Sequence, residues 1–366
     1  MVGYDFAPKD YLIPKTPRAL VKKWLFSYLL FIFIPLSIWL NRINFNPIVV
    51  AIVAILAIVP VTRLMAKSTE ELSMRTSPIV GSLLNATFGN AIEFMIAIFA
   101  IKAGLVEMVK ASLAGSIVLN ILSLIGLSMI FGGIKYREQT FNRDAAGVAS
   151  TMLLVAVAGL SLPTIYSVIT GKSTVVMSYA VSITLGITYL LSVVFVLITH
   201  RHLFEARRDV TEEPTWGIPR AVSVLILTAV LAAVESEVLV NGLHMIIKTT
   251  NLREVFVGMV LIAMITNIPE HLAAIRYGLK DNITLSLEIG MNSAIQIALF
   301  VAPILVLVSP LLGTQLSLSF APFQMVAMIL TVMIINYIGS DGICNWLEGV
   351  QLLAVYIIIG IAIYFI

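Results

Sequence analysis

The chain has 366 residues, of which 59% are hydrophobic and 12% are charged, and its formal net charge is +3. Such an apolar composition excludes a water-soluble globular protein of this length and indicates a protein that lives in a lipid bilayer. The single cysteine, Cys344, excludes a disulfide framework and a cysteine metal cluster. We expect no nucleic-acid partner.

The apolar stretches predict the membrane-spanning helices. A helix that crosses the hydrocarbon core needs about 20 mostly apolar residues. Polar or Gly/Pro-containing joints divide this sequence into eleven stretches of about that length, near residues 24–40, 47–66, 79–101, 107–133, 145–166, 174–200, 219–246, 254–279, 283–311, 320–339 and 345–366. The predicted fold class is therefore all-α integral membrane, with eleven transmembrane helices.

The basic residues predict how the chain is oriented, because Lys and Arg are enriched in cytoplasmic loops. With the N-terminus in the cytoplasm, most of the 23 basic residues fall on the inner side. Residues 1–23 lack the pattern of a secretory signal, so we expect a cytoplasmic tail there. No organelle address is apparent, and we expect a multi-pass protein of a prokaryotic plasma membrane. Homo-oligomerisation stays open.

An internal repeat runs through the sequence at an offset of 177 residues. It aligns residues 81–98 with residues 258–275, so that Asn90 meets Asn267 and Glu93 meets Glu270. Without a gap, Ser116 then meets Ser293. Apolar matches are common in such a composition, but Asn, Glu and Ser in register indicate duplication of an ancestral half.

The offset crosses five predicted spans, so the two copies enter the membrane from opposite sides, as in many transporters. We therefore expect two inverted five-helix repeats preceded by an extra helix. The predicted parts are a cytoplasmic tail and extra first helix at 1–45, a first repeat at 46–200, a cytoplasmic connector at 201–218 and a second repeat at 219–366.

The repeated glutamates, Glu93 and Glu270, lie near the middle of their predicted spans. A charged side chain at that depth costs about 2.5–3.5 kcal/mol on insertion scales, which makes both carboxylates candidates for function. Gly89 and Pro269 lie beside them and loosen the helix. The alternative for any single intramembrane glutamate is a structural hydrogen bond to a neighbouring helix.

The polar residues around these glutamates are oxygen donors, which suit a hard divalent cation, above all Ca²⁺. The predicted ion ligands are Glu93, Glu270, Asn90, Asn267, Ser116, Ser293 and Gln296, of which Gln296 is less specific, as are the further candidates Asn120 and Asn292. Two carboxylates at low dielectric also bind protons when the metal is absent. Ca²⁺ and H⁺ are thus expected to compete as transported substrates, with no cofactor.

Three further residues are candidates for a proton or ion pathway. Glu71 precedes the first repeated motif, and Glu237 lies with Glu235 in the seventh predicted span. His271 follows Glu270 directly and is placed to tune its protonation. The alternative for the two glutamates is a charge at the membrane interface that is satisfied by Lys, Arg or water. Against a role for His271 stands that side chains one residue apart face different ways on a helix.

Three segments carry a resemblance to a known family: LNATFGNAIE (84–93), KASLAGSIVLN (110–120) and SDGICNWLEGVQLLAVYII (340–358). They resemble the calcium/proton antiporters, the cation/proton exchanger family of the calcium/cation antiporter superfamily. The resemblance implies eleven spans, export of cytosolic Ca²⁺ against inward proton movement and an ion site on Glu93 and Glu270. Pro269 departs from the usual second motif and is similar to the sodium/calcium exchanger branch, which leaves Na⁺ as the alternative counter-ion.

The signatures of enzymes are incomplete. The segment TGKST (170–174) lacks the leading glycine of a phosphate-binding loop, and no HExxH zinc motif occurs. The segment GSDG (339–342) lacks a second intramembrane aspartate, which an intramembrane aspartyl hydrolase would require. We therefore expect a transporter and no enzyme, with an intramembrane hydrolase as the alternative from another class. Asn345 and Glu348 have the spacing of a capping box for the last helix.

Overall fold

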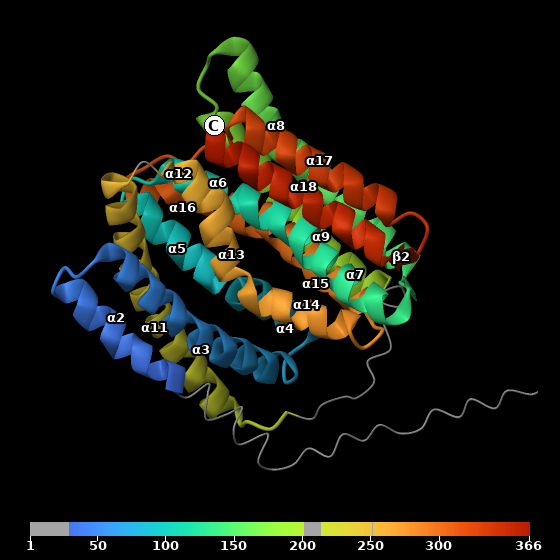
Figure 1. Ribbon diagram of the computed structural model, residues 1–366, viewed down its shortest axis with the longest axis horizontal. Helices are drawn as coiled ribbons and strands as arrows, with labels where there is room; N and C mark the ends of the chain where they lie inside the picture. Colours follow the sequence, from blue (N-terminus) through green and yellow to red (C-terminus); the bar gives the residue numbers. More distant parts are fainter. Residues whose placement is uncertain (1–28, 201–213, 251) are drawn as a thin grey trace, which may run out of the picture.

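The computed structural model describes residues 29–200, 214–250 and 252–366. The predicted tail and most of the predicted connector at 201–218 lie outside these residues. The described chain is almost entirely helical (Figure 1). In order, the helical elements are η1 (Leu30–Ile32), α2 (Phe33–Arg42), α3 (Pro47–Ser73), α4 (Pro78–Gly89), α5 (Ala91–Lys102), α6 (Val106–Val118), η2 (Leu119–Leu124), α7 (Ile125–Tyr136), α8 (Arg143–Thr170), α9 (Val175–Val194), η3 (Phe195–Thr199), α11 (Ile218–Thr249), α12 (Glu254–Phe256), η4 (Val257–Ile262), α13 (Ala263–Thr266), α14 (Ile268–Gly278), α15 (Ile283–Gln296), η5 (Ile297–Val301), α16 (Ala302–Val308), η6 (Ser309–Leu312), α17 (Pro322–Ile338) and α18 (Trp346–Phe365).

Many helices in the described part of the chain are long and apolar enough to span a membrane. Seven of its helices are long and apolar enough to cross a bilayer, or nine when each of two sharply bent helix pairs counts as one span. Two shorter apolar helices, Leu30–Arg42 and Pro322–Ile338, lie where the first and tenth spans were predicted. A multi-pass helical membrane protein is thereby confirmed, while the exact number of eleven spans stays a prediction.

Two short strands depart from the all-helical prediction. Strands β1 (Glu138–Thr140) and β2 (Ile343–Asn345) pair antiparallel, with Gln139 opposite Cys344. They tie the loop after α7 to the loop before α18, where hydrogen bonds between strands satisfy backbone groups that neither helix can satisfy. The capping box is confirmed, since the Asn345 side chain accepts hydrogen bonds from the backbone N–H groups of Leu347 and Glu348, while Glu348 accepts one from the Asn345 N–H.

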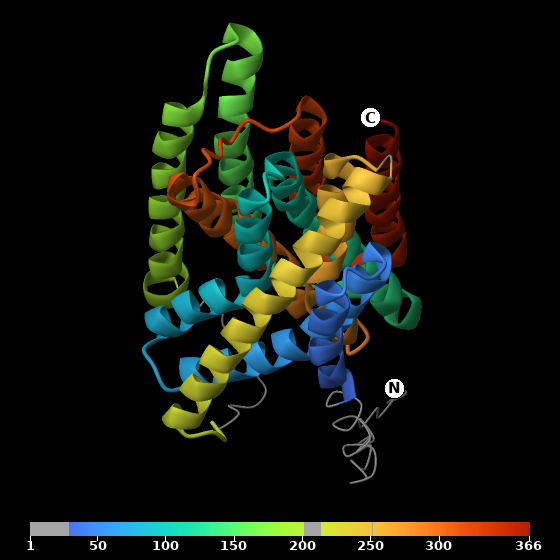
Figure 2. The same cartoon turned by 90° about the vertical axis from the view of Figure 1, so that its left-hand side faces the viewer.

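The helices form two groups around a centre of broken helices. Helices α2, α3 and α11 pack on one another at one side, and Figure 2 shows α11 crossing α3. On the other side α17 packs on α8 and α18 on α7 (Figure 1). Between these groups lie the broken pairs α4–α5 and α13–α14, beside the deeply buried span 106–136. The fold therefore brings two interrupted helices together in the middle of the molecule.

Glycine allows the helix backbones at this centre to touch. A Cβ added to Gly115 of α6 would lie 2.3 Å from the Met259 carbonyl oxygen. A Cβ added to Gly258 of η4 would lie 2.3 Å from the Met108 carbonyl oxygen. Small residues permit such close approach of membrane helices. The mutual contact brings Ser116, next to Gly115, beside the second broken helix.

Candidate ion-binding site

Both central helices break at an asparagine. The axis bends by 48° between α4 and α5, and by 57° between residues 254–266 and 268–278. Asn90 has φ −106° and ψ 19°, and Asn267 has φ −97° and ψ 13°, so both leave the helical region in the same way. The two repeated asparagines thus adopt nearly the same backbone conformation.

Proline alone does not explain the two breaks. Pro269 lies in the first turn of α14, just after the second break, where a backbone N–H has no intrahelical acceptor in any case. The α4–α5 break at Asn90 forms without a proline. The loosening of the helix by Pro269 stays a prediction, and the asparagine is the feature that the two breaks share.

The two repeated glutamates lie just after the breaks, in the first turns of α5 and α14. The N-terminus of a helix carries a partial positive charge and favours an anion there. Glu93 lies close enough to Glu270 for their charges to interact, and the Thr266 side chain lies near Glu93. Both glutamates are only partly exposed, and Glu270 Oε2 is buried with no hydrogen-bond donor in the described chain. A carboxylate oxygen in that position is suited to a cation or a proton.

The first break is held by a residue from the second repeat. Asn90 Nδ2 donates a 2.8 Å hydrogen bond to Gln296 Oε1 and a 3.0 Å hydrogen bond to the Ala86 carbonyl. Gln296 is the last residue of α15. Because both hydrogen bonds use Asn90 Nδ2 as the donor, the Oδ1 atom of Asn90 stays available as an acceptor or cation ligand.

The second break is held by residues from the first repeat. Asn267 Nδ2 donates to the Ser116 hydroxyl (3.3 Å) and to the Ala263 carbonyl (2.9 Å). Asn120 Nδ2 donates to Asn267 Oδ1 (2.9 Å) and to the Ser293 hydroxyl (2.8 Å). Each break is therefore bound by a side chain from the other predicted half.

All seven predicted ligands thus lie in one region around the two breaks. Asn120, less specific by sequence, is fully buried and bridges Asn267 to Ser293. Thr266 was not predicted, although a hydroxyl directly before Asn267, where the first repeat has Gly89, was a signal. The described residues hold no group of three or more His, Cys, Asp or Glu side chains that could bind a metal ion. Two carboxylates with neutral oxygens suit Ca²⁺ better than zinc, which prefers nitrogen and sulfur.

The three predicted pathway residues lie in different surroundings. His271 Nδ1 lies 2.8 Å from the Asn267 carbonyl oxygen, so the imidazole stabilises the backbone at the second break. Glu71 is buried at the end of α3 and accepts hydrogen bonds from the Thr215 hydroxyl and the Trp216 N–H, just before α11. Glu237 is exposed on α11. Of the three, His271 alone contacts the break region.

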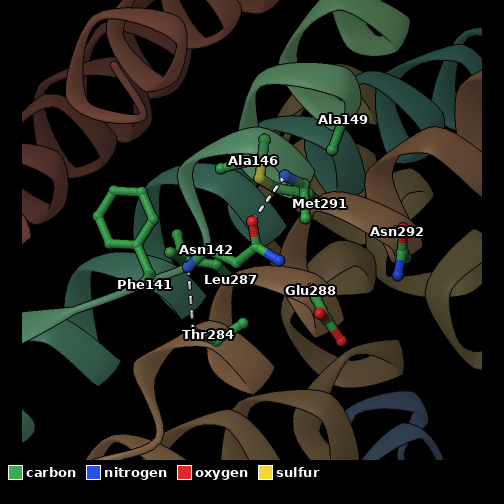
Figure 3. A pocket seen from close by; sticks show the side chains of 10 residues that line it. Phe141, Asn142, Ala146, Ala149, Thr284, Leu287, Glu288, Met291 and Asn292 are labelled. Atoms are coloured by element: carbon green, nitrogen blue, oxygen red, sulfur yellow. Dashed lines mark hydrogen bonds between the residues drawn. The ribbon is translucent and has the colours of Figure 1, made fainter. Parts of the chain in front are cut away.

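A small cavity lies beside the site, between α8 and α15. Its volume is about 20 Å³, room for about one water molecule. Figure 3 shows Asn142 at the start of α8 on one side and Glu288 with Asn292 on the other. Asn292 therefore lines this cavity, whereas Gln296, one turn later on α15, reaches Asn90.

Comparison with known proteins places this geometry in a family. The model of the sodium/calcium exchanger protein family matches residues 46–198 and 220–365. The chain belongs to the sodium/calcium exchanger family. A Ca(2+)/H(+) antiporter of Aphanothece halophytica is 38% identical, covering 92% of this chain and 95% of the relative. The Ca(2+)/H(+) antiporter ChaA of Bacillus subtilis is 35% identical, covering 90% and 96%.

Solved structures agree with the fold of this exchanger-family chain. The structure of native YfkE superposes with a TM-score of 0.80 at 32% identity, covering 93% of this chain and 99% of that one. The H⁺/Ca²⁺ exchanger CAX has a TM-score of 0.66 at 16% identity, which supports the fold alone. The resemblance to the cation/proton exchangers is thus confirmed.

Proposed function

We propose that this protein is a secondary antiporter that exports cytosolic Ca²⁺ in exchange for H⁺, and that Glu93 and Glu270 form the shared site. The observation that carries the proposal is the pair of interacting carboxylates at two matching helix breaks, with Glu270 Oε2 buried and lacking a donor. Relatives named as Ca²⁺/H⁺ antiporters over nearly the whole chain support the choice of substrates.

The chemistry of the pair explains why the two substrates exclude each other. Two ionised carboxylates at low dielectric repel each other and are poorly solvated. One Ca²⁺ ion neutralises both, and so do two protons, but the metal requires ionised oxygens. Occupancy by calcium therefore displaces protons, and protonation displaces calcium.

Neutral residues complete the calcium site. Asn90, Asn267, Ser116, Ser293 and Gln296 supply the oxygens in the region where the two breaks meet. Ca²⁺ accepts six to eight oxygens in a flexible arrangement, and backbone carbonyls at an interrupted membrane helix add to such a set. The hydrogen bonds that cross between the breaks orient the side chains before the ion arrives.

Exchange follows if the halves reorient only when the pair is neutralised. The predicted inverted five-helix repeats, with eleven spans and a cytoplasmic N-terminus, supply two related halves that open to opposite sides in turn. What supports this layout is the equal backbone geometry of Asn90 and Asn267. The ion gradients set the direction, because binding that is equal in both orientations drives nothing.

Sodium is the second candidate counter-ion, favoured by the family's name and by Pro269. The experiment that decides is Ca²⁺ uptake by proteoliposomes under an imposed pH gradient or an imposed Na⁺ gradient. Uptake that follows the pH gradient and is insensitive to Na⁺ is expected. Uptake that follows the Na⁺ gradient would replace H⁺ by Na⁺, and uptake that needs neither gradient would indicate a channel.

A further inference from the structure

Another buried carboxyl, that of Glu235, lies on α11 outside the exchange site. Glu235 is 0% exposed, and its side-chain contact crosses to the extra helix α2. The Ser37 hydroxyl oxygen lies 2.8 Å from both Glu235 Oε1 and Glu235 Oε2. The same oxygen lies 2.8 Å from the Ile34 carbonyl oxygen.

Counting protons at this cluster indicates the charge of Glu235. A serine hydroxyl has one hydrogen to donate and two lone pairs with which to accept. If Glu235 were ionised, one hydrogen would have to serve three acceptors, namely both carboxylate oxygens and the Ile34 carbonyl. If Glu235 carries a proton, the carboxyl donates to Ser37 and Ser37 donates to Ile34. The protonated carboxyl therefore fits the geometry.

The helices that pack around this carboxyl in the described chain offer it no compensating charge. Helices α2, α3 and α5 pack against α11. Their titratable or charged residues are Arg42 on α2, Arg63, Lys67, Glu70 and Glu71 on α3, and Glu93 and Lys102 on α5, while α11 itself has Arg220, Glu237, His244 and Lys248. In the described chain Glu235 bonds to none of these, and Ser37 is its partner. A buried carboxylate without a cation is strongly disfavoured, whereas the neutral acid is tolerated.

We propose that Glu235 is a proton-binding site separate from the exchange site, and that its proton stabilises the contact between α2 and α11. Helix α11 packs along α3 and α5, and α5 carries Glu93. Loss of the proton would place a charge between α2 and α11 with one hydroxyl to solvate it, so the contact would open. Glu235 is thus a positioning residue that makes transport sensitive to alkaline pH.

Infrared spectroscopy of the purified full chain in lipid tests the proton directly. The difference spectrum between the parent and E235Q at neutral pH should contain the carbonyl band of a protonated carboxylic acid. The variant S37A keeps the acid and should shift that band, because the hydrogen bond is gone. A difference spectrum with only ionised-carboxylate bands would overturn the proposal. If E235Q does not fold, S37A decides, and an unshifted acid band would refute the assignment.

Transport provides the second measurement and rests on the proposed function. Ca²⁺ uptake is driven by a fixed pH difference while both sides are raised together from neutral to alkaline pH. The protonated fraction of a carboxyl falls about tenfold for each pH unit above its midpoint, and uptake by the parent should fall with it. E235Q, which is neutral at every pH, should lose that decline.

The matched control is E138Q, because Glu138 is an exposed carboxylate on β1. E138Q should decline like the parent, and an E235Q profile that does the same would overturn the proposed control of transport. A parent that shows no proton-driven uptake would count against the antiporter function instead. The infrared result would still decide on the proton of Glu235.

Discussion

Replacing one carboxylate of the central pair, by E270Q, is the most direct perturbation of the site. Two unit charges about 4 Å apart attract by about 4 kcal/mol at an effective dielectric constant of about 20, and a divalent ion doubles this to about 8 kcal/mol. If about half of this attraction is offset because an amide costs less to desolvate than a carboxylate, the free energy of calcium binding falls by about 4 kcal/mol. Each 1.4 kcal/mol is about tenfold in affinity, so Ca²⁺ should bind E270Q about a thousandfold more weakly.

The fold should tolerate this change. Glu270 Oε2 is buried without a hydrogen-bond donor, and the Glu270 carboxylate interacts with that of Glu93. The amide of E270Q therefore removes the repulsion between the two carboxylates when no calcium is bound. We expect E270Q, and likewise E93Q, to melt at or above the temperature of the parent without calcium. E138Q is the matched control, because Glu138 is an exposed carboxylate on β1 and such surface substitutions change stability by about 0.5 kcal/mol or less.

Two assays check the reasoning. Proteoliposomes measure Ca²⁺ uptake, which should vanish in E270Q and persist in E138Q. Thermal unfolding with and without calcium measures binding separately from transport, because a ligand at a hundred times its dissociation constant stabilises by about 2.7 kcal/mol. Calcium should raise the melting temperature of the parent and not of E270Q. Transport at the parental rate, or an equal calcium shift in E270Q, would refute the shared site.

Two further substitutions and one labelling experiment test the structure around the site and elsewhere in the protein. S116A removes one hydrogen bond of about 1 kcal/mol and should weaken calcium affinity about fivefold in a titration; loss of expression instead would indicate a packing role. G115A would push a Cβ into the η4 backbone and should destabilise the protein by about 3 kcal/mol or more in thermal unfolding. G186A, where a Cβ meets nothing within 4 Å, is its control, and equal melting temperatures would contradict the close packing. Burial, aided by nearby Glu348, Asp341 and Asp281, raises the pKa of Cys344 to about 12, so its thiol should stay protonated and resist a maleimide at neutral pH until the protein unfolds; rapid labelling of the folded protein would argue against this.

Several features of the protein follow from local sequence properties. Apolar stretches of bilayer length determine where helices form, because no other single-segment structure satisfies the backbone in lipid. Asn345 and Glu348 set the start of α18 through bonds only three residues apart. The family resemblance rests on contiguous motifs such as residues 84–93 and could be drawn from them alone.

Other features depend on which helices pack together. The sequence places Glu235 and Glu237 two residues apart, but α11 turns Glu235 into the contact with α2 and leaves Glu237 exposed. The position of Asn120 between Asn267 and Ser293 joins residues 147 and 173 positions away. The hydrogen bonds from the chain just before α11 to Glu71, a predicted pathway residue, likewise join segments far apart in the sequence.

By itself, the sequence determined the membrane class, the repeated Asn and Glu motifs and the cap of the last helix, because length, register and near-neighbour hydrogen bonds are properties of contiguous residues. Only the tertiary structure decided which polar side chains meet, since a helix presents successive residues to different neighbours. Contacts between residues far apart in the chain then depend on how closely glycines such as Gly115 and Gly258 let the backbones approach.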